Sequence, residues 1–178
     1  RLVLRQWRES DFAPFAQLNA DPQVMQFYPR PLTAEESHAL ACRHQSLIAG
    51  RGWGFWAVEL RQTGFIGFVG LHIPTSELPF APCVEIGWRL ASAHWRKGYA
   101  REAARAALDF GFHELDLPEI VSFTTVGNYR SEAVMRSIGM QRDALTFEHP
   151  SVPPGNPLRE HCLYRLSRQA FLERRRSE

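Results

Sequence analysis

The most regular hydrophobic pattern in the chain lies between residues 100 and 115. Small and apolar residues recur there at helical spacing: Ala100, Ala103, Ala104, Ala107, Leu108, Gly111, Phe112 and Leu115. A helical face this rich in alanine predicts a helix that lies close against a sheet. Leu117-Pro118 follows and should close the helix.

Short runs rich in Phe, Val, Ile and Trp precede that helix at residues 55–60, 64–72 and 83–90. Turn-forming residues separate them, which predicts an antiparallel meander. Gly64, Gly67 and Gly70 lie inside the second run, where close packing or a bulge is the simplest explanation.

The rest of the chain fits a mixed α/β fold. Strands are expected at residues 1–5, 120–125 and 161–166. Helices are expected after a cap at Ser10-Asp11, over 34–48 with a cap at Thr33 and a stop at Gly50, and over 128–138 with Gly139 as the left-handed cap. The expected order is strand, two helices, three strands, helix, strand, helix, strand.

Composition limits the remaining possibilities. The length of 178 residues predicts one domain over residues 1–178. A net charge of +2 gives no reason to expect a nucleic-acid or membrane partner, and the Arg174–Arg176 run is interpreted as a solvated end. Three widely spaced cysteines and no long apolar stretch predict a cytoplasmic protein.

The segment from 85 to 102 is the best candidate for chemistry, because a strand, a cationic loop and a helix start follow one another there. Helix N-termini have unpaired N–H groups and partial positive charge, so they bind phosphate when the backbone is accessible. Gly98 and Ala100 give that access, and Arg96 and Lys97 add charge. The spacing matches neither a Walker A loop nor a dinucleotide fingerprint.

The run Trp95-Arg96-Lys97-Gly98-Tyr99-Ala100 resembles the acyl-coenzyme A pyrophosphate loop of the GNAT superfamily of N-acetyltransferases. Trp95 stands where Gln or Arg is usual, which is similar to ribosomal-protein N-terminal acetyltransferases of the RimJ/RimL type. Three other segments resemble that branch in order and spacing: residues 1–11, Glu85-Ile86-Gly87-Trp88, and Asn128-Tyr129-Arg130-Ser131 with Ile138-Gly139-Met140.

The resemblance implies a mixed, mostly antiparallel sheet with flanking helices, in which the fourth and fifth strands splay apart. It also implies that acetyl-coenzyme A (acetyl-CoA) is the cosubstrate, with no metal. The residues implied in cofactor binding are Trp88, Arg89 and Leu90 beside the pantetheine arm, Arg96, Lys97, Gly98, Tyr99 and Ala100 at the pyrophosphate, and Asn128 and Ser131 near the pantetheine and thioester.

The predicted reaction is direct acetyl transfer to a primary amine in a ternary complex. Glu85 is the predicted base, with Glu59 and His72 as weaker candidates. Many members of the superfamily carry a tyrosine acid seven residues after the position of Asn128, but Met135 stands there and cannot donate a proton. Ser131 is the remaining nearby donor, and solvent is the alternative.

The acceptor is a peptide N-terminus or a small amine, and the first two helices and the meander should form its entrance. Tyr28 and Trp53 are the chosen substrate-binding residues, from a set of aromatic candidates that also includes Phe27, Phe55 and Trp56. A zinc site at His38, Cys42 and His44 is disfavoured, because His44 does not share the face of the other two.

Two other functions stay open. The chain could bind coenzyme A without turnover, as a sensor or subunit, or bind nucleic acid through its basic loop and Arg tail. Family analogy also suggests a homodimer.

Overall fold

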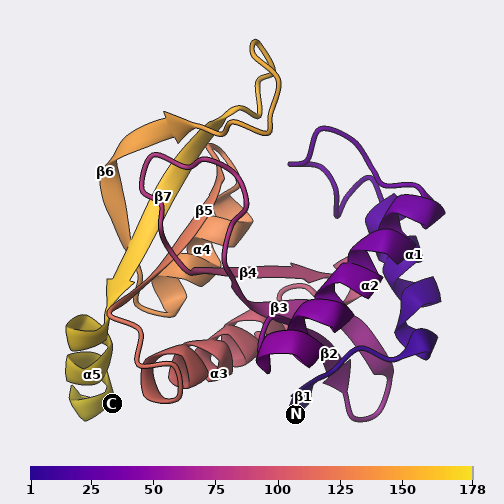
Figure 1. Ribbon diagram of the computed structural model, residues 1–178, viewed down its shortest axis with the longest axis horizontal. Coiled ribbons are helices and arrows are strands. Elements are labelled where there is room, and N and C mark those ends of the chain that lie inside the picture. The colour runs from indigo at the N-terminus through magenta and orange to yellow at the C-terminus, as the bar shows by residue number, and fades with distance from the viewer. Residues whose placement is uncertain (178) are drawn as a thin grey trace. The chain divides into compact units, whose positions relative to one another are not determined.

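The computed structural model describes residues 1–177, which form two compact units. Unit 1 comprises Arg1–Leu71 and Gly87–Ala104, and unit 2 comprises residues 72–86 and 105 onward. Strand β4 (Glu85–Leu90) and helix α3 (Tyr99–His113) contribute residues to both units (Figure 1). The prediction of one domain over residues 1–178 stays a prediction.

The described strands follow the order β1-β2-β3-β4-β5-β7-β6. Antiparallel pairs join β1 to β2, β2 to β3, β5 to β7 and β6 to β7, whereas β4 and β5 run parallel. The bounds of the other strands are β1 (Leu2–Arg5), β2 (Phe55–Leu60), β3 (Gly64–His72), β5 (Glu119–Thr125), β6 (Gln141–Glu148) and β7 (Glu160–Ser167). The mixed, mostly antiparallel α/β fold is therefore confirmed.

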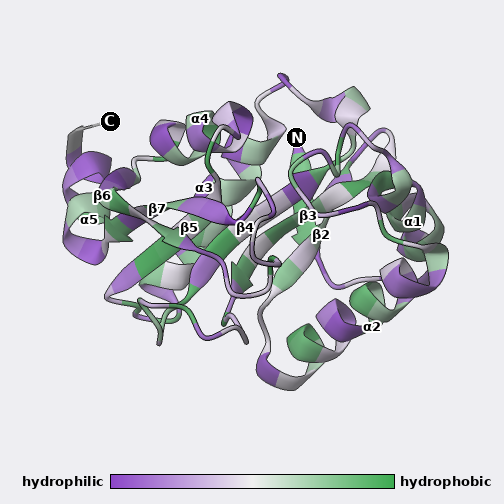
Figure 2. Ribbon diagram, turned by 90° about the horizontal axis from the view of Figure 1, so that it is seen from above, coloured by the Kyte–Doolittle hydropathy of each residue, from purple (hydrophilic) through white to green (hydrophobic). Residues whose placement is uncertain are grey.

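The core of unit 1 lies between strands β2 and β3 and the helices α1 (Phe12–Ala20) and α2 (Ala34–Arg51). Its buried residues include Trp7, Phe15, Leu18, Ala41, Ile48, Ala57 and Phe68. Figure 2 shows hydrophobic and hydrophilic residues in turn along α2, which is the pattern of a helix with one buried face.

Helix α2 begins as the sequence predicts but ends later. Thr33 and Glu36 form a capping box, with the Thr33 side chain accepting from the Glu36 N–H at 3.1 Å. The helix continues to Arg51 and ends at Gly52, whose φ is +84°. The predicted stop at Gly50 is wrong, because Gly50 keeps a helical conformation and Gly52 adopts the left-handed one.

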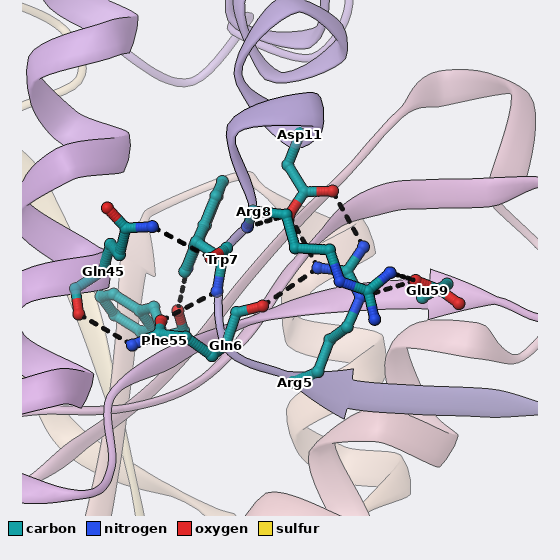
Figure 3. A network of polar contacts seen from close by, with 8 residues as sticks. All are labelled: Arg5, Gln6, Trp7, Arg8, Asp11, Gln45, Phe55 and Glu59. Carbon is teal, nitrogen blue, oxygen red and sulfur yellow. Dashed lines mark hydrogen bonds and ion pairs between the residues drawn. The ribbon is translucent and has the colours of Figure 1, made fainter.

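An ion-pair network ties the first strand of unit 1 to its neighbours (Figure 3). Arg5 donates to both carboxylate oxygens of Asp11, at 2.7 and 2.8 Å, and to Glu59 at 2.6 Å. Asp11 precedes α1, but its side chain makes no cap bond to that helix and instead accepts from Arg5 and the Arg8 N–H. A 3-10 turn, Glu9–Asp11, separates β1 from α1, and Asp11 is the N-cap residue of α1 as predicted, although its side chain caps no N–H of that helix.

Gly67 confirms the predicted bulge in β3. The register of β2 and β3 shifts between Val58 and Glu59, opposite this glycine. Gly67 has φ +143°, and a Cβ there would lie 2.1 Å from the Arg89 carbonyl oxygen. Glycine is thus required for both conformation and space.

Unit 2 contains two elements that the sequence analysis missed. Strand β6 pairs with β7, and helix α5 (Arg168–Ser177) covers the C-terminal run of arginines. Phe171 of α5 stacks on Phe112 at 4.6 Å between ring centroids, and Arg175 pairs with Asp109 at 2.9 Å. Residues 174–176 are exposed, as expected for a solvated run, but they belong to helix α5 and not to a frayed end.

Helix α4 (Tyr129–Ser137) confirms the predicted cap at Asn128, and Gly139 after it has φ +94°. Tyr164 of β7 ties this helix to the sheet. Its hydroxyl donates to Glu132 at 2.7 Å and accepts from Arg136 at 3.1 Å. Within the described residues, no helix is both long and apolar enough to span a membrane.

Candidate active site

The loop before α3 brings backbone N–H groups and cations together in unit 1. A 3-10 turn, Ser92–His94, follows β4, and α3 begins at Tyr99 directly after Gly98. Arg96, Lys97 and Gly98 are exposed. The first N–H groups of a helix have no intrahelical partners, so this end of α3 offers donors to an anion.

Two residues of this loop adopt left-handed backbone conformations. Gly98 has φ +80° and Arg96 has φ +59°. Left-handed residues near a helix start turn successive N–H groups toward one concavity, which is a known anion-binding arrangement. Positive φ is uncommon for arginine, and such strain concentrates at functional sites. The sequence predicted a role for both residues, but it gave no signal for the left-handed conformation of Arg96.

Contacts from β4 and the N-terminus hold the loop in place. The Trp95 indole N–H donates to the Leu90 carbonyl at 2.8 Å. Arg1 donates to the Lys97 carbonyl at 3.2 Å, pairs with Glu102 at 2.6 Å and stacks on the Tyr99 ring. The cationic loop is thus braced on both sides.

The three predicted cofactor residues of β4 differ in their surroundings. Leu90 is buried and its carbonyl already accepts from Trp95, while Trp88 is half-buried. Arg89 directs its guanidinium to Asn19 of α1, with 2.7 Å between Nη1 and Oδ1.

Glu85 lies at the start of β4, in unit 2, where it pairs in register with Val121 of β5. Its carboxylate has no hydrogen-bond or ion-pair partner among the described residues, and burial raises its pKa to about 8. Burial and the nearby Glu85 carboxylate also raise the pKa of the Cys83 thiol. A carboxyl group in this state can accept a proton from an ammonium group near neutral pH.

The weaker base candidates are placed differently. Glu59 accepts from both Arg5 and Arg8, at 2.6 and 3.1 Å, so its carboxylate is already engaged. His72 is half-buried at the end of β3.

Asn128 and Ser131 come together in unit 2 at the start of α4. The Asn128 amide donates to Thr124 Oγ1 at 2.9 Å and to Ser131 Oγ at 3.2 Å. Its oxygen accepts from the Ser131 N–H at 3.4 Å. Met135, at the usual tyrosine position, is buried at 1% exposure.

The two predicted acceptor residues lie apart within unit 1. Tyr28 is exposed and its ring stacks on Arg89, with 4.2 Å from the guanidinium carbon to the ring centroid. Trp53 follows the end of α2 and stacks on Arg51 at 3.8 Å. Their roles in binding stay predictions.

Unit 2 also has an aromatic cluster that the sequence analysis missed. Phe123 of β5 contacts Phe80, Phe147, His149 and His161, with ring centroids 5.7 to 6.4 Å away. Burial, followed by the charges of His161 and Arg159, lowers the pKa of His149 to about 4, and burial lowers that of His161. Both imidazoles are therefore neutral at pH 7.

The three residues of the disfavoured zinc site do not converge. Cys42 Sγ lies 3.8 Å from His38 Nε2, whereas His44 packs among the rings of Trp7, Phe55 and Phe68. In residues 1–177, no three His, Cys, Asp or Glu side chains are grouped to hold a metal ion.

Comparison with known proteins identifies the class. The family model described as an acetyltransferase (GNAT) domain matches residues 1–141. The chain is thus a member of the GNAT acetyltransferases, and the resemblance drawn from the 95–100 loop is confirmed at that level. It is an acetyltransferase enzyme, of a family that uses acetyl-CoA.

Individual relatives agree with this assignment. The FsC-acetyl coenzyme A-N(2)-transacetylase of Aspergillus fumigatus is 30% identical over 164 residues, which cover 87% of this chain and 68% of that protein. A crystal structure of an acetyltransferase from Agrobacterium tumefaciens is 31% identical, with a TM-score of 0.74 and coverage of 93% and 90%.

A more distant structure supports the fold alone. The spermidine N-acetyltransferase of Vibrio cholerae, in complex with CoA and spermine, is 22% identical. Its TM-score is 0.73, with coverage of 96% of this chain and 98% of that one.

Proposed function

We propose that this protein transfers the acetyl group of acetyl-CoA directly to a primary amine, with Glu85 as the general base. The observation that carries the proposal is the Glu85 carboxyl group, which has no partner among the described residues and a pKa of about 8. An ordinary surface glutamate is ionised and solvated at pH 7, whereas this one can exchange protons there.

Glu85 acts in the first step of the proposed reaction, the removal of a proton from the acceptor. Ionised Glu85 takes a proton from the acceptor ammonium, directly or through one water molecule. The freed amine nitrogen then bonds to the thioester carbonyl carbon, and the carbon–sulfur bond breaks after an oxyanion intermediate. The nitrogen loses its second proton as the amide forms, while the thiolate leaves with the electron pair and takes up one proton. The products are therefore an amide, a thiol and the proton that Glu85 returns to solvent.

The loop before α3 fits the pyrophosphate of the cosubstrate. The N–H groups of residues 96–100 and the charges of Arg96 and Lys97 would hold it, and no side chain at Gly98 obstructs the backbone. Asn128 would contact the pantetheine arm. Its amide already caps α4, so that contact would be shared with Thr124 and Ser131.

The proton for the leaving thiolate has two proposed sources. Ser131 is half-buried and its hydroxyl oxygen already accepts from Asn128, which leaves its own O–H free to turn toward sulfur. Solvent is the other source. Tyr164, a phenol of the same unit, is a poor alternative because its hydroxyl donates to buried Glu132.

The acceptor class is an amine, either a peptide N-terminus or a small molecule. The relatives named above fit this class: one is a transacetylase named for an N(2) position and one is named for spermidine. Placement in the RimJ/RimL branch stays part of the proposal.

The test combines cofactor binding with turnover. Acetyl-CoA at about 100 times its dissociation constant should stabilise the fold by about 2.7 kcal/mol, a rise of roughly 5–10 °C in the unfolding midpoint. Gly98→Trp should abolish the rise. Thiol release with an amine panel should depend on Glu85, so that Glu85→Gln lowers kcat while acetyl-CoA still stabilises the fold.

The outcomes separate the proposal from its alternatives. Stabilisation by acetyl-CoA with no turnover on any amine would favour a coenzyme A-binding sensor. Absence of stabilisation would remove the basis of the proposed function.

A further inference from the structure

Arg89 of β4 is held in place from inside unit 1. Its Nη1 donates to Asn19 Oδ1 at 2.7 Å. The Asn19 amide nitrogen donates in turn to Ser37 Oγ of α2 at 2.8 Å, which fixes its oxygen toward Arg89. Asn19 and Ser37 are both 0% exposed. The guanidinium is therefore positioned by two buried side chains before any ligand arrives.

Two aromatic rings flank this guanidinium. Its carbon lies 4.2 Å from the ring centroid of Tyr28 and 5.4 Å from that of Phe68. Phe68 is buried, whereas Tyr28 is 39% exposed. The cation thus sits between the core of unit 1 and a ring that faces solvent.

The charge of Arg89 has no counter-charge in the described residues. Several arginines of unit 1 have one: Arg5 pairs with Asp11 and Glu59, Arg1 with Glu102, and Arg30 with Glu36. Half-buried Arg51, like Arg89, forms no ion pair within residues 1–177. For Arg89, no carboxylate in residues 1–177 forms an ion pair, and its Nε is buried without an acceptor. A partly desolvated charge without a counter-charge is costly, and an anionic ligand would reduce that cost.

One donor of the Arg89 guanidinium stays open to a ligand. Asn19 occupies Nη1, and Nε is buried, so a ligand oxygen does not reach either of them. Nη2 forms no hydrogen bond within residues 1–177 and is not among the buried unpartnered atoms, so it can donate to a carboxylate oxygen.

We propose that Arg89, flanked by Tyr28, binds a carboxylate of the acceptor, so that the acceptor is an amine that also carries a carboxylate, such as an amino acid or a peptide. This inference rests on the proposed function and on the acceptor entrance that the sequence predicts at the first two helices and the meander. A polyamine, which has no anionic group, would leave Arg89 without a counter-charge.

The first test measures binding without turnover. The protein without acetyl-CoA is titrated calorimetrically with L-leucine, the dipeptide Leu-Leu and sodium acetate, and with L-leucinamide and Leu-Leu amide, which lack the carboxylate. The carboxylates should bind and the matched amides should bind roughly ten- to hundredfold more weakly, the usual range for a charge-assisted bond. Arg89→Gln should remove the difference.

Matched variants keep the result interpretable. Arg89→Gln removes the charge, and Arg89→Lys keeps the charge but not the planar guanidinium, so it should retain part of the preference. Arg43→Gln, an exposed arginine of α2, should leave binding unchanged. Each variant is also tested for stabilisation by acetyl-CoA, which reports the cofactor site.

The inference is overturned if carboxylates and amides bind equally, if neither binds, or if Arg89→Gln keeps the preference. It is also overturned if Arg89→Gln weakens acetyl-CoA instead, because the anion would then be a cofactor phosphate. Inorganic phosphate is titrated as an additional probe. If it binds as tightly as the carboxylates do, Arg89 is a general anion site and the inference is overturned. Loss of acetyl-CoA stabilisation in the wild type would instead refute the proposed function.

Discussion

Replacing Glu85 with glutamine should stabilise the fold, and increasingly so as pH rises. Burial raises the pKa of this carboxyl from 4.5 to about 8, so the folded state holds a proton that the unfolded state releases above pH 4.5. The favourable contribution of the protonated group is complete below pH 4.5 and is lost as pH rises toward 8. Glutamine does not titrate and has no such loss.

The magnitude follows from the size of the shift. One pKa unit corresponds to about 1.4 kcal/mol, so the 2.5 units between 4.5 and pH 7 amount to about 3 kcal/mol. The full shift to pH 8 amounts to about 5 kcal/mol. The difference in unfolding free energy between Glu85→Gln and the wild type should be small at pH 4.5, grow by about 1.4 kcal/mol per pH unit, and level off above pH 8.

Urea unfolding at half-unit pH steps from 4.5 to 9 measures this difference. Glu77→Gln is the matched control, since Glu77 is an exposed carboxyl of the same unit and should give a difference near zero throughout. A difference that does not change with pH, or one in which the wild type gains stability over the variant as pH rises, would mean that Glu85 is ionised in the folded protein. The argument for its role as base would then fail.

The kcat/KM of the wild type should rise with pH to a plateau above about 8, because only ionised Glu85 can accept the proton. Glu85→Gln should lose this inflection, and steady-state thiol release measures both profiles. Gly98→Ala should lower the free energy of unfolding by about 1–2 kcal/mol, because a φ of +80° is strained for alanine. Gly50→Ala, within helix α2, should instead raise the free energy of unfolding by about 0.5–1 kcal/mol. Equal effects of the two variants in thermal unfolding would contradict the backbone argument. Tyr164→Phe should lower the free energy of unfolding by about 1–3 kcal/mol, because buried Glu132 loses its hydroxyl donor. An unchanged unfolding midpoint would show that the ion pairs with Arg136 and Arg142 are enough to stabilise Glu132. Asn128→Ala should lower the free energy of unfolding by about 1 kcal/mol through the lost cap, whereas Asn128→Ser should keep the cap but weaken acetyl-CoA binding. If the serine variant binds acetyl-CoA as tightly as the wild type, the Asn128 amide has no role beyond capping.

Local signals predicted most of the elements. The alanine-rich face of α3, the Thr33 cap of α2 and the Asn128 cap of α4 depend on residues within a few positions of one another, and the structure confirms all three. Strand β6 escaped prediction because its residues are mostly exposed and do not alternate, so pairing with β7 alone defines it as a strand. Helix α5 was not predicted because it is stabilised by contacts with α3, in which Phe171 stacks on Phe112 and Arg175 pairs with Asp109.

The sequence by itself predicted the family, which the comparisons confirm, and it gave the predictions of a phosphate-binding loop and of Glu85 as base, because each depends on residue type and short spacing. Tertiary structure decided the chemical state of those residues. Burial raised the pKa of Glu85, and the Arg5 and Arg8 guanidinium groups engaged Glu59, its rival. Folding also placed Asn19 beside Arg89, 70 positions away in the sequence, and this contact fixes the position of the Arg89 guanidinium. Nothing in the sequence distinguishes Arg89 from other arginines. Desolvation and long-range pairing belong to the folded chain, so no local pattern of residues encodes them.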